Sequence, residues 1–159
     1  MTLPRAAARP PGRAGIAGRR VTARDAIVAS VLAAVVSGAP STIVASATGD
    51  DPLRATRAAG SLLVRDGDGV ALVAAGAVTH AAISLGWGTA LAVLLPRRHT
   101  VAAGAVAGLA IAALDLGVIG RRFPAIRSLP SAPQLADHVA FGACVGAVLS
   151  ARARRRRRR

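Results

Sequence analysis

Residues Ala26–Thr48 read AIVASVLAAVVSGAPSTIVASAT, a stretch with no charged side chain. As a helix it is long enough to cross the hydrocarbon core of a bilayer, because about 20 apolar residues suffice. Three further apolar stretches follow in the 159-residue chain, and none alternates apolar and polar faces as a soluble domain does. The sequence therefore predicts an all-α, polytopic membrane protein with four transmembrane helices in one bundle. The expected spans are about 26–48, 69–95, 100–120 and 131–150.

The basic residues, all of them Arg, lie outside the expected spans and orient them. They are concentrated in residues 1–25, at Arg97 and Arg98, and after residue 150, whereas each of the two other connections holds three. Cytoplasmic loops are enriched in Lys and Arg, so both termini are predicted to be cytoplasmic in a multi-pass protein of the inner membrane. We expect a disordered basic tail over 1–25, a transmembrane domain over 26–150 and a poly-Arg cytoplasmic tail over 151–159.

The N-terminal stretch also has features of a cleavable signal peptide. It combines a basic start, an apolar run from Ala26 to Val36 and the triplet Ala45-Ser46-Ala47. Cleavage would leave three spans, and both versions place the C-terminus inside. The apolar character continues past Pro40 for a full span, which favours retention of the first helix.

Four ionisable side chains interrupt the expected spans and are the candidates for a site. Such groups are costly in hydrocarbon and mark ligand sites and proton relays. At about 1.5 Å of rise per residue, three of them reach one level in the outer third of the membrane, together with two hydroxyl residues of the first span. The fourth, His80, lies slightly deeper. The candidate ligand or proton residues are His80, Asp115, Asp137, His138, Ser41 and Thr42.

Two interpretations of these residues remain open. One is a small-ligand or proton site in a transport-related protein, because a carboxylate beside His can titrate near neutral pH. The other is a purely structural hydrogen-bond network in a structural or accessory membrane subunit. A zinc site is disfavoured, since the two His and two Asp are spread over three helices and only Asp137 and His138 are closely spaced. We expect no metal and no cofactor.

Proline and glycine predict two features of the helices themselves. Pro40 has no amide hydrogen, so it would free the carbonyl of Val36 and kink the first span next to Ser41 and Thr42. Glycines four residues apart allow helix backbones to approach closely, and we expect the third and fourth spans to meet at such pairs. The pairs are Gly104 with Gly108 and Gly142 with Gly146.

The sequence also disfavours several functional classes. It contains no nucleophile elbow, Walker loop, His-Glu zinc motif or dinucleotide fingerprint, so we expect no enzyme and no catalytic residue. The formal charge of +14 would suggest a nucleic-acid partner in a soluble protein, but here it lies at the ends of the spans. The expected partners are membrane lipids, with anionic head groups at the Arg tails and no nucleic acid. The oligomeric state is not predicted.

The chain resembles small, uncharacterised four-span integral membrane proteins of GC-rich bacteria in four segments. They are SGAPST from Ser37, VTHAAIS around His80, ALDLG around Asp115 and ADHVAFG around Asp137. The resemblance covers residues 26–150. It implies a membrane location and the number of spans, and it implies no activity or catalytic residue.

Overall fold

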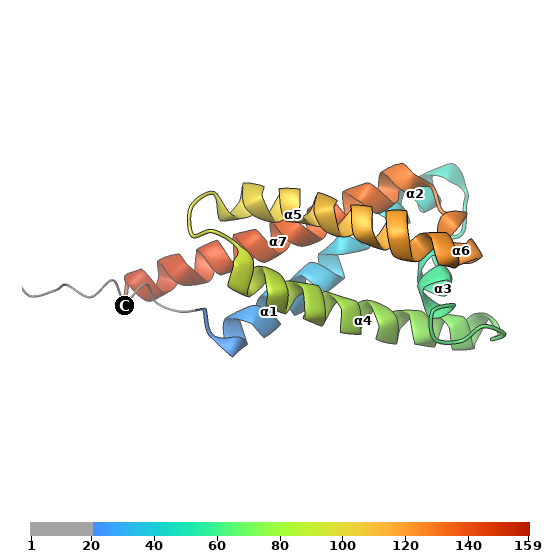
Figure 1. Cartoon of the computed structure of the whole chain (residues 1–159), viewed down its shortest axis with the longest axis horizontal. Helices are drawn as coiled ribbons and strands as arrows, with labels where there is room; N and C mark the ends of the chain where they lie inside the picture. The colour runs from blue at the N-terminus through green and yellow to red at the C-terminus, as the bar shows by residue number, and fades with distance from the viewer. Residues whose placement is uncertain (1–20) are drawn as a thin grey trace, which may run out of the picture.

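The computed structural model describes residues 21–159, and this part of the chain is helical, without a strand (Figure 1). Residues 1–20, most of the predicted basic tail, lie outside the described residues. Four helices are long and apolar enough to cross a membrane, which confirms the predicted all-α architecture. They cover Ala23–Thr48, Gly69–Leu94, Thr100–Arg122 and Ser131–Arg157.

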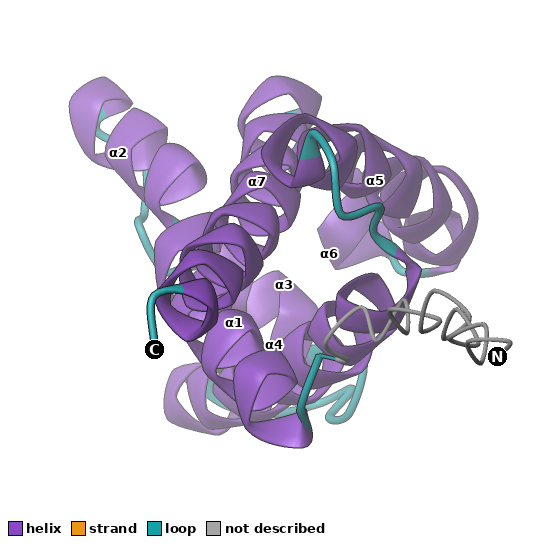
Figure 2. Cartoon of the chain, turned by 90° about the vertical axis from the view of Figure 1, so that its left-hand side faces the viewer, coloured by secondary structure: helices purple, strands orange, loops and turns teal. Residues whose placement is uncertain are grey.

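The first of these four is broken into two helices at Gly38. α1 covers Ala23–Ser37 and α2 covers Ala39–Thr48. α1 begins before the predicted boundary because Thr22 and Asp25 form a capping box, in which each side chain accepts the other residue's backbone amide. Figure 2 shows α2 lying apart from α1 and α4, and α2 packs mainly on the last helix, α7.

The other three long helices differ in how they end. α4, Gly69–Leu94, is capped by Asp68 and closes just before Pro96. α5, Thr100–Leu114, runs on as a π-helical segment, Asp115–Ile119, and a 3-10 turn, Gly120–Arg122. α7, Ser131–Arg157, continues through most of the segment predicted to be a poly-Arg tail. Arg has a high helix propensity and cations are stabilised at a helix C-terminus, which explains the extension.

Two short helices lie together at the end of the molecule away from the start of α1 (Figure 1). α3 covers Arg54–Gly60, and α6 covers Pro124–Arg127, within the connection between the third and fourth long helices. The guanidinium group of Arg54 donates a 2.9 Å hydrogen bond to the carbonyl of Ser128. The two connections at this end are therefore joined to each other.

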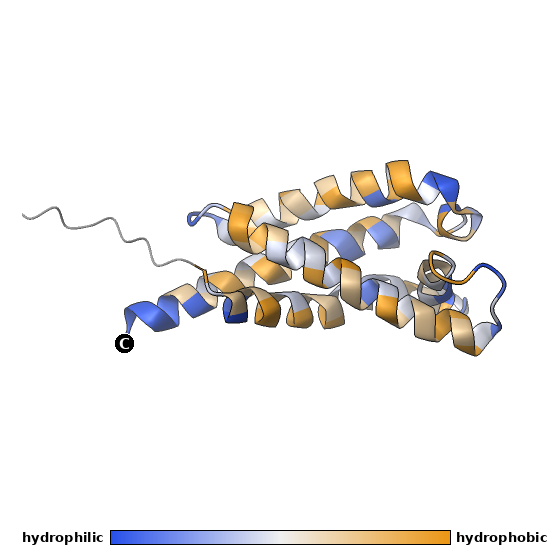
Figure 3. Cartoon of the chain, turned by 60° about the horizontal axis from the view of Figure 1, so that its bottom comes forward, coloured by the Kyte–Doolittle hydropathy of each residue, from blue (hydrophilic) through white to orange (hydrophobic). Residues whose placement is uncertain are grey.

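The long helices pack through small residues and leave larger apolar side chains on the outside. α7 contacts α1, α2, α4 and α5, and α4 also contacts α1 and α3. Ala29, Ala33 and Val145 are completely buried. Val35 and Val93, by contrast, are both more than three-quarters exposed, and Figure 3 shows apolar residues along the outer faces of the helices. An apolar exterior over small buried residues is typical of helices packed in lipid.

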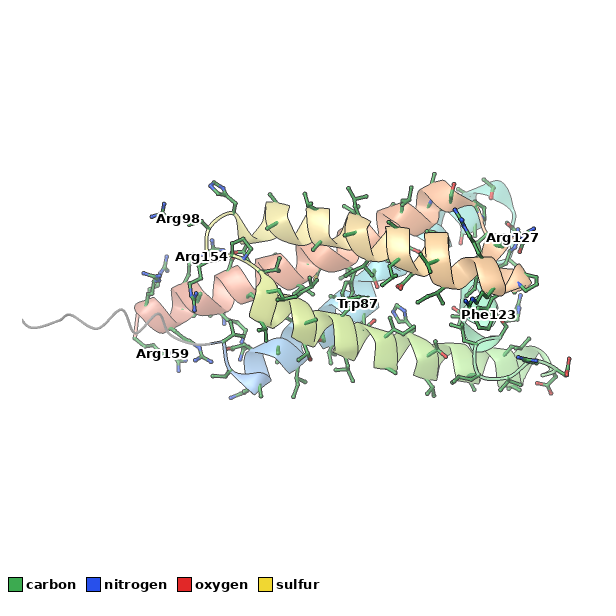
Figure 4. The ribbon with its side chains drawn as sticks, in the orientation of Figure 1. Trp87, Arg98, Phe123, Arg127, Arg154 and Arg159 are labelled. Carbon is green, nitrogen blue, oxygen red and sulfur yellow. The ribbon has the colours of Figure 1, made fainter. Side chains whose placement is uncertain are left out.

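Arginine side chains occupy the two ends of the molecule. Figure 4 places Arg98, Arg154 and Arg159 at the end where α1 begins and α7 ends, and Arg127 at the opposite end. Trp87 lies between these ends, within the helical region (Figure 4). The arrangement leaves a central apolar zone bounded by charge on both sides.

Candidate functional site

The break at Gly38 removes helical hydrogen bonds on both sides of it. The Gly38 amide donates to the carbonyl of Val36, not to that of Ala34 as in a continuous α-helix. The carbonyl of Val36 was predicted to lack a donor because Pro40 has no amide hydrogen, but the amide of Gly38 donates to it. Downstream, Ser41 stands in the first turn of α2, where amides have no partner within the helix. The break thus leaves the carbonyl of Ala34 and the amide of Ser41 without helical backbone partners, and the hydroxyl of Ser37 donates to the Ala34 carbonyl at 3.2 Å.

Two of the predicted site residues bind these exposed backbone groups. His80 of α4 donates through Nε2 to the carbonyl of Ala34, at 2.9 Å. Asp137 of α7 accepts the amide of Ser41 through Oδ1, also at 2.9 Å. A carboxylate at this position is favoured because the N-terminus of α2 carries a partial positive charge. Neighbouring helices therefore satisfy the backbone on both sides of the break.

Asp115 and His138 form the second polar contact. Asp115 opens the π-helical segment that follows α5, and its Oδ2 lies 3.4 Å from Nε2 of His138 on α7. The other ring nitrogen of His138, Nδ1, lies 2.7 Å from the carbonyl of Gln134. A carbonyl only accepts, so Nδ1 must carry a proton. π-helical segments inside α-helices are frequent at functional sites.

The protonation of this pair follows from its geometry. With its proton on Nδ1, a neutral His138 presents a lone pair at Nε2 to the carboxylate of Asp115. Two facing acceptors repel, so the contact is favourable only when the pair holds one more proton. That proton is either on Nε2, giving an imidazolium beside a carboxylate, or on the carboxyl group of Asp115. Both side chains are 20% exposed, so neither is sealed from its surroundings.

All six predicted ligand or proton residues line one cavity. Its volume is about 430 Å³, within the range of small-molecule sites in proteins. Residues from the broken helix, α4, the π-helical segment and α7 contribute to its wall, and α3 and α6 line it at the end away from the start of α1. The predicted residues on the wall are Ser41, Thr42, His80, Asp115, Asp137 and His138.

One further polar residue of the cavity wall, Thr79, was not anticipated. Thr79 is only 7% exposed, and among residues 21–159 its Oγ1 is the only buried side-chain nitrogen or oxygen without a hydrogen-bond partner. A buried hydroxyl without a partner is costly unless water or a ligand satisfies it. The apolar part of the wall includes Ile83, Trp87 and Ile111. The cavity therefore combines an apolar surface with convergent polar groups.

Glycines determine how closely α5 approaches α7, the helix that carries His138. A Cβ added at Gly104 would meet the carbonyl of Gly142, and one added at Gly146 would meet the carbonyl of Thr100. At Gly108 the obstacle would be the carbonyl of His138 itself. The predicted Gly pairs thus lie where α5 touches α7, next to the Asp115 and His138 contact.

Asp25, which was predicted to belong to the N-terminal tail, takes part in a further polar contact. Asp25 is 4% exposed and forms ion pairs with Arg152 and Arg156 near the end of α7. Arg156 also donates to the hydroxyl of Thr22 at 2.9 Å. Asp25 and its two Arg partners lie far apart in the sequence. The only sequence signal for the contact is an acidic residue at the edge of an apolar span. Within residues 21–159 no three His, Cys, Asp or Glu residues gather closely enough to hold a metal ion.

Comparisons with protein-family models, with curated proteins and with solved structures find no match to this chain. The site is therefore interpreted from its own geometry.

Proposed function

We propose that the chain is a multi-pass protein of a bacterial inner membrane, with both termini in the cytoplasm. In this proposal its cavity binds a proton and a small ligand, as part of a transport-related activity. The four long apolar helices support the membrane location. The concentration of Arg at the end shared by the start of α1 and the end of α7 supports the orientation. The cavity then lies toward the outer side of the membrane.

The observation that carries the proposal is the hydrogen bond from Nδ1 of His138 to Gln134. It directs the second ring nitrogen of His138 at Asp115 and gives the pair a place for one exchangeable proton. Intramembrane acidic residues paired with His are the usual elements of proton relays. Trp87 lines the same cavity, so a ligand beside the pair would meet an apolar ring.

Trp87 provides a direct test, because it is the only Trp in the chain and there is no Tyr. The fluorescence of the purified full chain in detergent is recorded between about pH 5 and pH 8, the range in which His usually changes charge. We expect the wild-type emission to change with pH, because the charge of the cavity beside Trp87 changes with the pair. Asp115→Asn and His138→Gln should shift the midpoint or abolish the transition, while circular dichroism shows the helices intact.

His99→Gln is the matched control. His99 precedes α5 in the connection at the other end of the molecule and does not line the cavity. The control should keep the wild-type transition. His80→Gln removes the contribution of the second histidine in the cavity. In that variant the fluorescence transition should still depend on Asp115. An identical transition in the wild type and in Asp115→Asn would overturn the proposal.

The alternative function is that of a structural or accessory membrane subunit. It is favoured by one observation, that His80 and Asp137 each satisfy a backbone group at the helix break. In a purely structural network Asp115→Asn would lower the thermal stability without removing any pH-dependent signal. The fluorescence experiment tests the exchangeable proton of the pair, which the structural alternative does not require.

A further inference from the structure

A second cavity lies at the opposite end of the molecule, where α1 begins and α7 ends. Its volume is about 440 Å³, and it is lined by Arg24, Arg152, Arg155, Arg156 and Arg159. Three of them belong to α7 at spacing i, i+3 and i+4, which places them on one face of the helix, and Arg159 follows the end of α7. We call these five residues the arginine pocket.

Asp25 positions part of the arginine pocket. Its two carboxylate oxygens bind Arg152 and Arg156, which stand one helical turn apart on α7. Asp25 is itself fixed by the capping box with Thr22. The ion pairs therefore dock the last turns of α7 onto the first turn of α1. Without such a contact a run of like charges would repel and remain solvated.

The charge of the arginine pocket is far from balanced. Asp25 forms ion pairs with two of the five arginines, and within residues 21–159 no ion pair involves Arg24, Arg155 or Arg159. Arg155 and Arg159 are both exposed. Guanidinium groups match phosphate because they donate two parallel hydrogen bonds. A phosphate group would therefore complement the excess positive charge of the pocket.

The position of the arginine pocket indicates where that phosphate comes from. Leu149, shortly before Arg152, is still part of the apolar core. On α1, Ile27 and Val31 lie just beyond Asp25 and are half exposed. A ligand in the pocket would therefore have guanidinium groups around its charged end and an apolar helix surface beside it. A phospholipid has this combination, whereas free phosphate has only the charged end.

We propose that the arginine pocket is a binding site for the phosphate of an anionic phospholipid head group, with the acyl chains along the apolar surface of α1. This site is separate from the polar cavity and does not depend on its function. It also differs from general attraction of a basic tail to a membrane, because it requires Arg155 and Arg159 and not merely positive charge.

The test compares two double variants that remove the same charge from the same segment, the end of α7 and the two residues after it. Arg155→Gln with Arg159→Gln changes the pocket, and Arg154→Gln with Arg158→Gln changes Arg residues outside it at the same spacing. Both leave Asp25 and its partners in place, so both should keep the wild-type melting temperature. The full chain in mild detergent is mixed with equal amounts of phosphatidylglycerol and phosphatidylcholine, and bound lipid is measured by native mass spectrometry.

We expect the wild-type chain to retain phosphatidylglycerol in preference to phosphatidylcholine. The pocket variant should bind phosphatidylglycerol about tenfold or more weakly, since each Arg adds appreciably to binding of an anionic surface. The control should change the preference by less than about twofold. Equal losses in the two variants would overturn the proposal, because they would show that net charge alone matters.

A second arm distinguishes lipid from soluble phosphate. Inorganic phosphate is added to the complex of wild-type chain and phosphatidylglycerol at the concentration of the lipid phosphate. The lipid should remain bound, because inorganic phosphate gains nothing from the apolar surface. Displacement of the lipid under these conditions would assign the pocket to a soluble phosphate and would overturn the proposal.

Discussion

The carboxylate of Asp137 accepts the backbone amide of Ser41 across a distance of 2.9 Å, although the two residues belong to the last and the first membrane-length helices. The contact fixes the first turn of α2 to α7. Since α2 packs mainly on α7, this hydrogen bond determines where the second half of the broken helix lies. It therefore shapes one wall of the polar cavity.

Removing this carboxylate should destabilise the protein. We expect Asp137→Ala to lower the free energy of unfolding in detergent by about 1–2 kcal/mol, because the amide of Ser41 loses its acceptor in an apolar environment. Asp137→Asn keeps an acceptor oxygen and should cost less. Unfolding followed by circular dichroism measures both. Asp66→Ala, at an exposed loop position, is the control, and an equal effect there would contradict a role for the Ser41 contact.

The same exchange, Gly to Ala, should have opposite effects at two positions. Gly108→Ala places a Cβ against the carbonyl of His138, so we expect a loss of about 1–3 kcal/mol in unfolding free energy from overpacking. Gly86→Ala lies in α4 with nothing within 4 Å of the new Cβ, and should gain up to about 1 kcal/mol from helix propensity. Denaturation curves compare the two. A gain at both positions would show that α5 and α7 are not in close contact.

Thr79 allows a test of the unpartnered hydroxyl. We expect Thr79→Val to leave the unfolding free energy unchanged or to raise it by up to about 1 kcal/mol, because it removes a buried polar atom without changing the shape of the side chain. Thr79→Ser keeps the hydroxyl and loses a methyl group, and should be less stable than the wild type. Thermal melts of the ligand-free protein give both values. If Thr79→Val were the less stable variant, the hydroxyl would have a partner in solution.

Asp25 should be the most sensitive acidic residue at the end where α1 begins. Asp25→Ala removes the capping box and the partner of Arg152 and Arg156, so we expect a loss of about 2–4 kcal/mol in unfolding free energy. Asp50→Ala breaks an exposed ion pair with Arg54 and should cost at most about 1 kcal/mol. Chemical denaturation in detergent measures the two. Equal effects would mean that the Asp25 contacts are as solvated as a surface pair.

Depth along a helix follows from residue number, which is why the sequence predicts that Asp115, Asp137 and His138 lie at a similar level. The direction of a side chain around the helix axis depends on helix packing, and periodicity does not reveal it in spans that are apolar on all sides. The contact of Nε2 of His138 with Asp115, and that of Asp137 with Ser41, therefore required the structure.

The position of α2 after the break at Gly38 could not be predicted from the sequence either. Pro40 predicted a kink, since a missing amide removes a helical hydrogen bond. How far α2 departs from α1 depends on two side chains of neighbouring helices. His80 of α4 supplies a donor, and Asp137 of α7 supplies an acceptor. Asp25 was missed for a related reason, because a residue at the edge of a span is assigned to the tail unless its distant partner is known.

The glycines between α5 and α7 give this protein an unusual genetic vulnerability. In a chain so rich in alanine, exchanging Gly for Ala is among the mildest changes in composition and hydropathy. At Gly108 that exchange would nevertheless press a methyl group against the backbone of His138 and separate its ring from Asp115. A harmful variant at this position would thus look harmless in the sequence, and its effect would fall on a carboxylate and an imidazole that were not themselves mutated.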